Sequence, residues 1–198
     1  MTHTPGFEET LKDLLAQSAK PESLGTWLKR RCPRACFRPA KCRPARTMAP
    51  HLAGYIVERV SGEPFEEYIA RLIFAPLGMA HSTFVQPLPP ALAPFMSQGY
   101  DRALDKPETF EMKPMAPAGA LSASGDDIAR FMLAHLNNGS FGGAQILEPE
   151  TAMLMHSVAY QHTPGIPPWH TASTARIETV TLSSATAAIR NGFTATYI

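Results

Sequence analysis

The stretch Leu52-Ala-Gly-Tyr-Ile-Val-Glu-Arg-Val-Ser-Gly62, followed by Pro64-Phe-Glu-Glu-Tyr-Ile-Ala-Arg-Leu-Ile-Phe-Ala-Pro76, decides the fold. Apolar residues recur at spacings of three and four in the first stretch, and Ser61-Gly62 ends this helical pattern. They are Leu52, Ile56, Val57 and Val60. Pro64 suits the first position of a second helix that ends at Ala75-Pro76. Its predicted apolar face consists of Phe65, Ile69, Leu72 and Ile73. The sequence therefore predicts a helix pair joined by a tight turn.

Weaker helical patterns lie on both sides of this pair. Upstream, residues 8–20 have leucines at helical spacing, and Ser23 can cap a short helix. The apolar residues are Leu11, Leu14 and Leu15 in the former, and Leu24, Trp27 and Leu28 in the latter. Downstream, Ser124-Gly-Asp-Asp127 resembles a capping box with a shorter acid, and Asn137-Asn138-Gly139 supplies a stop. A further short helix is expected near residues 150–155.

Two segments have little periodicity. Residues 80–118 are rich in proline and predict a long loop that could cover a cleft. The tail from 170 to 198 has 16 Ala, Ser or Thr among 29 residues, so it could make a weak strand that nothing ties to a core. The chain is expected to be predominantly helical with long loops.

The charges are sorted along the chain. The formal net charge is +1, but residues 23–50 carry eight basic and no acidic groups, whereas residues 51–155 carry six basic and twelve acidic ones. All three cysteines also lie in this basic segment. The length of 198 residues and the 44% hydrophobic content fit one domain, with no apolar run long enough for a membrane span and no start typical of a signal peptide.

The sequence contains only weak candidates for a metal or nucleic-acid site. Cys32, Cys36, Cys42 and His51 are possible zinc ligands, but their spacings match no usual paired-ligand pattern. The basic residues between 29 and 46 are accompanied by one aromatic residue, Phe37, so we expect no nucleic-acid site there. His135 is interpreted as a capped or solvated helix residue rather than a ligand. We predict no metal and no cofactor.

A covalent hydrolase needs a nucleophile with a base held against it. The chain contains no Gly-x-Ser-x-Gly, Ser-x-x-Lys, Tyr-x-Asn, Lys-Thr-Gly or His-x-Gly. The nearest approach is Thr26-Trp27-Leu28-Lys29, which would place Thr26 and Lys29 one helical turn apart. Threonine is a rare substitute in such a pair, and we interpret the spacing as chance. The sequence therefore assigns no catalytic residue.

Several consecutive stretches nevertheless resemble the beta-lactamase-related serine hydrolases, the kin of class C beta-lactamases and penicillin-binding D-alanyl-D-alanine peptidases. These are Thr2-His-Thr-Pro-Gly-Phe7, the Leu52 to Gly62 stretch, Ile73-Phe-Ala-Pro-Leu-Gly-Met79 with His81-Ser-Thr-Phe84, and Pro117-Ala-Gly-Ala-Leu-Ser-Ala123 leading into Asp127-Ile-Ala-Arg-Phe-Met132. The resemblance covers about residues 1–30 and 51–168. It implies an α+β fold with a helical region beside a sheet, and a serine hydrolase acting on beta-lactams, D-alanyl peptides or small esters.

The same resemblance shows where catalytic motifs are missing. The family's Ser-x-x-Lys would precede Met1, its Tyr-x-Asn would come just before Leu52, and its Lys-Thr-Gly or His-x-Gly would follow Trp169. The last two places hold the basic cysteine segment and the Ala/Ser/Thr tail. We therefore expect a partial domain over 1–168, with aberrant sequence at 29–50, and an aberrant tail at 169–198.

The aberrant stretches suggest a shifted reading frame. Codons can be chosen for Cys32 through Pro50 so that reading two nucleotides later gives Pro-Ala-Arg-Val-Phe-Pro-Pro-Gly-Lys-Val-Pro-Ala-Cys-Ser-Asn-Tyr-Gly-Ala. This text is close to the family's approach to Tyr-Ser-Asn, with Cys in place of Tyr. The same shift from Trp169 onward permits a reading that contains Ile-Gly-His-Gly-Gly-Asp-Thr, and hence His-x-Gly. The sequence-based hypothesis is a catalytically inactive product of a 5′-truncated, frameshifted gene, with a small-molecule substrate only if an intact site existed.

The sequence is compatible with two alternatives. The basic segment 29–46 could make the chain a non-catalytic interaction protein that binds anionic partners. A fragment could also expose the apolar helix faces meant for a sheet and aggregate. The compartment is not assigned, although family members are often periplasmic or secreted.

Overall fold

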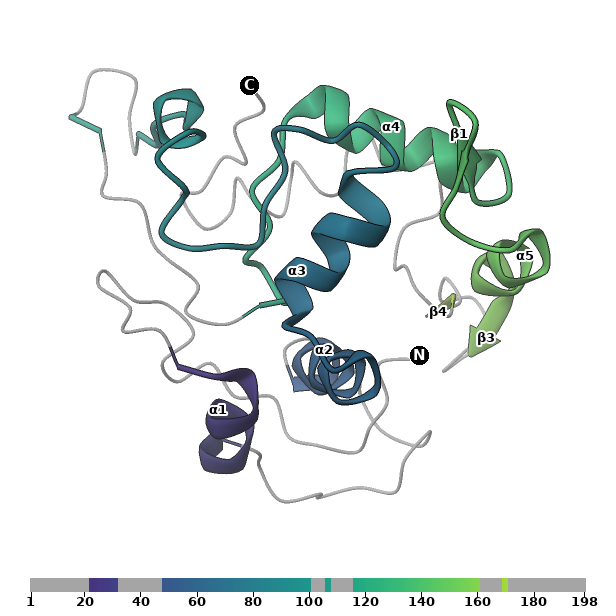
Figure 1. The fold of residues 1–198 in the computed structure, drawn as a ribbon, viewed down its shortest axis with the longest axis horizontal. Coiled ribbons are helices and arrows are strands. Elements are labelled where there is room, and N and C mark those ends of the chain that lie inside the picture. The colour runs from purple at the N-terminus through teal and green to yellow at the C-terminus, as the bar shows by residue number, and fades with distance from the viewer. Residues whose placement is uncertain (1–21, 32–47, 101–105, 108–115, 161–168, 171–198) are drawn as a thin grey trace.

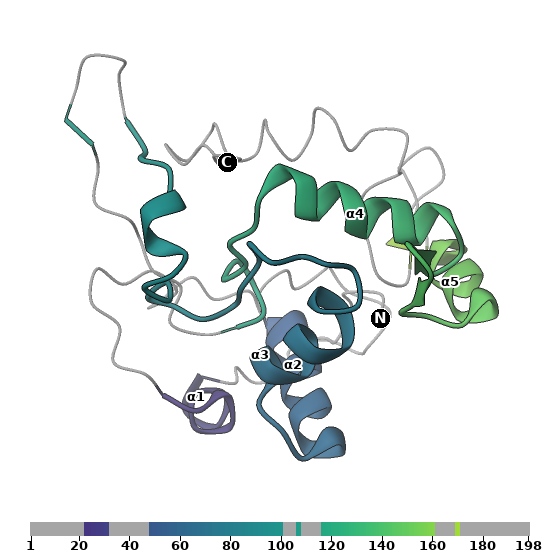
Figure 2. The ribbon, with the colours of Figure 1, turned by 45° about the horizontal axis from the view of Figure 1, so that its top comes forward.

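The computed structural model describes residues 22–31, 48–100, 106–107, 116–160 and 169–170. Its helices are α1 (Leu24–Arg31), α2 (Met48–Ser61), α3 (Phe65–Ile69), the π-helix η1 (Ala70–Phe74), the 3-10 helix η2 (Ala93–Phe95), α4 (Gly125–Leu136) and α5 (Pro149–His156). Its strands are β1 (Ser140–Phe141), β2 (Ala144–Gln145), β3 (Val158–Tyr160) and β4 (Trp169–His170). Figures 1 and 2 show α3 between α2 and α4. The predicted predominance of helices and loops is confirmed in these residues.

Helix α1 begins as its capping residue predicts. The Ser23 hydroxyl accepts a hydrogen bond from the Thr26 N–H at 3.2 Å, which satisfies one of the backbone donors left free at a helix start. The apolar side of α1 is buried with Met48 of α2, and Tyr55 packs against the cluster. The buried α1 residues are Leu24, Trp27 and Leu28, as the sequence predicted. This is the first of two small cores.

The buried face of α2 is not the predicted one. Ile56 is 52% exposed and Val60 is 83% exposed, so the apolar stripe of this helix is largely uncovered in the described structure. The buried residues are Met48, Ala49, His51 and Gly54. Helix α2 packs through its first half, where Gly54 gives the Pro117 ring room: a Cβ at this position would lie 2.8 Å from Pro117 Cδ. Hydrophobic periodicity predicted where this helix lies in the sequence, but it did not predict which face of the helix is buried.

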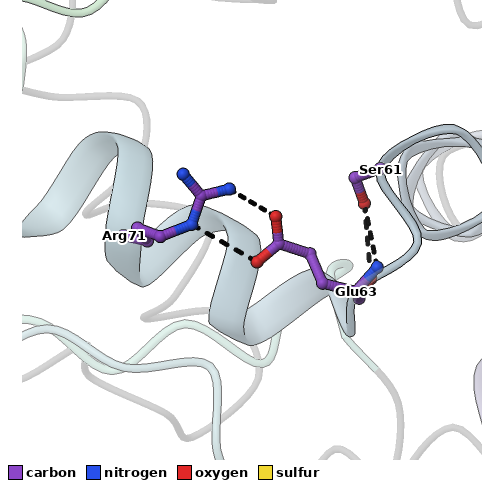
Figure 3. A network of polar contacts seen from close by, with 3 residues as sticks. All are labelled: Ser61, Glu63 and Arg71. Carbon is purple, nitrogen blue, oxygen red and sulfur yellow. Dashed lines mark hydrogen bonds and ion pairs between the residues drawn. The ribbon is translucent and has the colours of Figure 1, made fainter.

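A tight turn joins α2 to α3, as predicted. Gly62 has a φ of +79°, a left-handed conformation that favours glycine, and ends α2. Pro64 is the residue before the helix rather than its first residue, and the Phe65 N–H donates to Glu58 Oε1 at 3.2 Å. The side chain of Arg71 reaches back to the Glu63 carboxylate, which raises the pKa of Arg71 by hydrogen bonding and charge (Figure 3).

Helix α3 continues into the π-helix η1, a change that the sequence did not predict. The Ala75 N–H donates to the Ala70 carbonyl at 2.9 Å, five residues back, just before Pro76. This wider turn changes which side chains face inward. Leu72 is 37% exposed, contrary to the predicted face, whereas Phe74 is buried. Phe74 joins the second core, whose other buried members are Leu77, Met79 and Ala134 of α4.

The described parts of the proline-rich segment form the expected loop. Phe84 packs against Phe65 and Phe74, with ring centroids 5.2 and 6.0 Å away. Thr83 and Ser122 then form an isolated antiparallel bridge, with N···O distances of 2.8 and 2.9 Å. The two ends of the segment are therefore held side by side.

Helix α4 has the predicted cap but not the predicted capping box. The Ser124 hydroxyl accepts from the Asp127 N–H at 3.2 Å, as in an N-cap. The Asp127 carboxylate instead accepts hydrogen bonds from the His81 N–H and the Ser82 hydroxyl, both at 2.8 Å. Asp127 is 3% exposed, so this carboxylate fixes the start of α4 to a loop far away in the sequence. The expected stop is confirmed, with Asn138 in the left-handed region at a φ of +53°.

Two short hairpin-like pairs complete the described structure. Strands β1 and β2 pair antiparallel around Gly142 and Gly143, whose φ values are +61° and +85°. Strands β3 and β4 also pair antiparallel, so Trp169–His170 is a strand tied to residues 158–160. The rest of the predicted tail lies outside the described residues, as do residues 8–20. The expected helix near 150–155 is confirmed as α5. No described helix has both the length and the hydropathy needed to cross a bilayer.

Candidate functional site

A cavity of about 880 Å³ lies beside the first core, and we call it the α1–α2 cavity. Its walls come from α1, α2, the start of α3, and the loop segments at 84–86 and 116. Residues with polar or aromatic side chains in these walls include Ser23, Thr26, Lys29, Tyr55, Glu58, Arg59, Phe65, Phe84 and Gln86. The cavity thus contains the Thr26 and Lys29 pair that the sequence singled out.

The contacts of Thr26 do not equip it as a nucleophile. Its hydroxyl lies 2.8 Å from the Ser23 hydroxyl within the cap of α1. A threonine nucleophile needs a neighbouring base to take its proton, and a serine hydroxyl is not such a base. Lys29 is an exposed residue one turn further along α1. The chance interpretation of this spacing stays a prediction, which acylation experiments can test.

Other polar groups of the α1–α2 cavity hold the fold together. Glu58 accepts from the backbone of Phe65, and Gln86 donates from Nε2 to the Ala120 carbonyl at 2.9 Å. Tyr55 packs against the first core through its ring. No sequence pattern predicts this grouping, since the walls come from segments that only the tertiary fold brings together. The arrangement offers a polar pocket without a visible catalytic pair among these lining residues.

Of the four possible zinc ligands, His51 lies in the described part of the chain. His51 is 1% exposed and its ring centroid lies 4.6 Å from that of Trp27, so it is part of the first core. Cys32, Cys36 and Cys42 lie outside the described residues. Among the residues that the structure describes, no group of three His, Cys, Asp or Glu side chains is placed to hold a metal ion.

His135 is only partly solvated, and it contacts a second histidine. Its ring is half-buried on α4, 4.6 Å from the Phe131 ring between centroids, and its Nδ1 lies 3.2 Å from Nε2 of His156 on α5. Burial, followed by the charge of His156, lowers the pKa of His135 below its ordinary value of 6.5. The sequence missed this pair because 21 residues and a hairpin separate its members.

Comparison with known proteins identifies the family. The model of the beta-lactamase family matches residues 1–169. The chain belongs to the beta-lactamase family. Two curated relatives named "Putative D-alanyl-D-alanine carboxypeptidase", from Escherichia coli O157:H7 and Escherichia coli K12, are 26% and 28% identical, and each alignment covers 52% of this chain and 29% of the relative. The chain therefore spans less than a third of the length of these relatives.

Solved structures of this family share the fold. A structure titled as a putative beta-lactamase from Bacteroides dorei is 25% identical, with a TM-score of 0.59 over 83% of this chain and 44% of its own. A penicillin-binding protein from Bacillus halodurans is 20% identical, with a TM-score of 0.64 over 86% of this chain and 53% of its own. The beta-lactamase/transpeptidase-like fold implied by the resemblance is confirmed.

Proposed function

We propose that the 198-residue chain is a non-catalytic member of the beta-lactamase family that forms no acyl-enzyme. The observation that carries this proposal is the absence of Ser-x-x-Lys, Tyr-x-Asn, Lys-Thr-Gly and His-x-Gly from the whole printed sequence. The covalent route needs an activated nucleophile, and its loss removes the largest share of catalysis in such enzymes. The cap contact of Thr26 supports the proposal, because it leaves this hydroxyl with a hydroxyl rather than a base as its described neighbour.

Acylation tests this proposal directly. The purified chain is incubated with a fluorescent penicillin and, separately, with an activated ester, and its intact mass is measured. We expect no mass increase, whereas a family enzyme that has Ser-x-x-Lys gains one acyl group under the same conditions. A stoichiometric adduct on any serine or threonine would refute the proposal. If the adduct lies on Thr26, the Lys29→Ala variant decides whether Lys29 activates it.

We further propose that residues 32–50 and 169–198 are out-of-frame translations of family sequence. Two alternate readings support this idea, since one contains His-x-Gly and the other contains Cys-Ser-Asn at the places where the resemblance expects His-x-Gly and Tyr-Ser-Asn. The family model matches residues 1–169, so its match runs through residues 32–50 and ends where the proposed out-of-frame tail begins. Sequencing the gene and the bases upstream of it tests the proposal. Nucleotides that cannot encode the alternate readings would contradict it.

The basic segment favours one second candidate function, the binding of an anionic partner. Residues 23–50 carry eight basic and no acidic groups, and within α1 both Lys29 and Arg30 are exposed. Arg30 already forms an ion pair with Glu22 at 2.5 Å. Retention on heparin measures this function: it should fall with added salt and be lost when the arginines of 30–46 become alanine. Equal retention of the variant would exclude it.

A further inference from the structure

The histidine pair of α4 and α5 has the geometry of two ligands to one metal ion. His135 Nδ1 and His156 Nε2 are 3.2 Å apart. A transition ion about 2.0–2.1 Å from each nitrogen separates the two nitrogens by about 2.9 Å in a cis octahedral site and about 3.3 Å in a tetrahedral one. The observed distance lies between these two values. Either imidazole nitrogen can serve as a ligand.

Rigid elements hold the two rings in place. His135 is in the last turn of α4, next to Ala134, which is fully buried in the second core. His156 is the last residue of α5, whose Ala152 is also fully buried. The β1–β2 hairpin connects the two helices and places Phe141 against the same core. A site built on packed helices keeps its ligands close to the binding geometry before the ion arrives.

The environment suits an ion that prefers imidazole. Both rings are half-buried, so water can reach the ion and fill its remaining positions. A neutral imidazole nitrogen that carries no proton can bind such an ion, so metal binding releases protons and weakens as the pH falls. Zn²⁺, Ni²⁺ and Cu²⁺ bind imidazole nitrogen well, whereas Mg²⁺ and Ca²⁺ prefer oxygen.

We propose that His135 and His156 form a two-histidine site for one divalent transition ion of the Zn²⁺ and Ni²⁺ class, completed by water. This proposal is independent of the proposed lack of acylation. Among the described residues, no third His, Cys, Asp or Glu side chain forms a group with this pair, so this part of the chain supplies two ligands.

Nickel binding to the full chain tests the proposal. NiCl₂ is titrated calorimetrically into wild type, His135→Gln, His156→Gln and the control His81→Gln, whose wild-type ring is on an exposed loop residue beside Phe95. We expect the first two variants to lose one bound equivalent, or about a hundredfold in affinity at that site, and the control to match wild type. Equal binding by all four proteins would overturn the proposal.

A measurement on the unaltered chain covers the case in which a variant does not fold. Exchange of the imidazole C2 proton is followed for each histidine by mass spectrometry, with and without one equivalent of NiCl₂. A bound ion blocks the protonation that this exchange requires, so exchange should slow at both His135 and His156 and stay unchanged at His81. Slowing at neither ring, or at only one, means that the pair is merely a hydrogen bond between helices and refutes the site.

Discussion

Replacing Asp127 with alanine should destabilise the fold more than any other single change at the start of α4. The carboxylate is buried, and its Oδ2 accepts two hydrogen bonds, from the His81 N–H and the Ser82 hydroxyl. Both donors come from a loop that is 45 or more positions away in the chain. The substitution removes the only acceptor that these two bonds share and disconnects α4 from the loop.

The magnitude follows from the two bonds. A hydrogen bond to a charged group contributes about 1.5–3 kcal/mol to the free energy of unfolding. His81 is exposed, so water can satisfy its N–H after the substitution, whereas Ser82 is half-buried and regains less. We therefore expect Asp127→Ala to lower the free energy of unfolding by about 3 kcal/mol, and Asp127→Asn, which keeps one accepting oxygen, by about 1–2 kcal/mol.

Urea denaturation followed by far-UV circular dichroism measures the effect. Asp126→Ala is the matched control, because Asp126 is the neighbouring acid in the first turn of α4 but is exposed. The control should lose a few tenths of a kcal/mol through the helix dipole alone. If Asp127→Ala and Asp126→Ala have the same midpoint and slope, the buried carboxylate does not hold the loop, and the reasoning is wrong.

Three further outcomes are expected. Trp27→Ala removes a side chain that is 3% exposed from the centre of the first core, so it should lower the free energy of unfolding by about 3–5 kcal/mol in the same urea assay. A loss under about 1 kcal/mol would mean that α1 does not pack against α2 through Trp27. Gly139→Ala should lower the free energy of unfolding by at least about 2 kcal/mol, because φ is +93° and the new Cβ would clash with the Leu147 carbonyl oxygen. Unchanged stability would contradict this backbone geometry. With a chelator present, the free energy of unfolding should fall as the pH drops below 6.5, because His135 takes up a proton in the unfolded chain that the folded ring resists. His135→Gln should flatten this part of the pH profile, and a slope equal to that of wild type would refute the lowered pKa of His135.

Local signals predicted the helices well. The caps at Ser23 and Ser124 and the stop at Gly62 depend on a few neighbouring residues, and the structure confirms each of them. The family resemblance, which depends on longer stretches, is also confirmed. These features could be predicted because the information for each is contiguous in the sequence.

Other features depend on contacts that periodicity does not encode. The π-turn at 70–74 shifts the buried position to Phe74, and a helical pattern with constant spacing cannot anticipate such a shift. Strands β1 and β2 have two residues each, too few for an alternating pattern. The same limit applies to the pairing of His135 with His156 and to the walls of the α1–α2 cavity, because tertiary packing alone brings those residues together.

Contacts at both ends of the proline-rich segment hold these ends next to each other, so the segment forms a closed loop. The Thr83–Ser122 bridge closes it, and the Asp127 carboxylate secures the same end of the molecule. Doubling the length of such a closed loop costs only about 0.6 kcal/mol of entropy. The entropic cost of inserting residues between Thr83 and Ser122 is therefore small, provided that Phe84, Gln86 and Pro117, which make tertiary contacts, are kept.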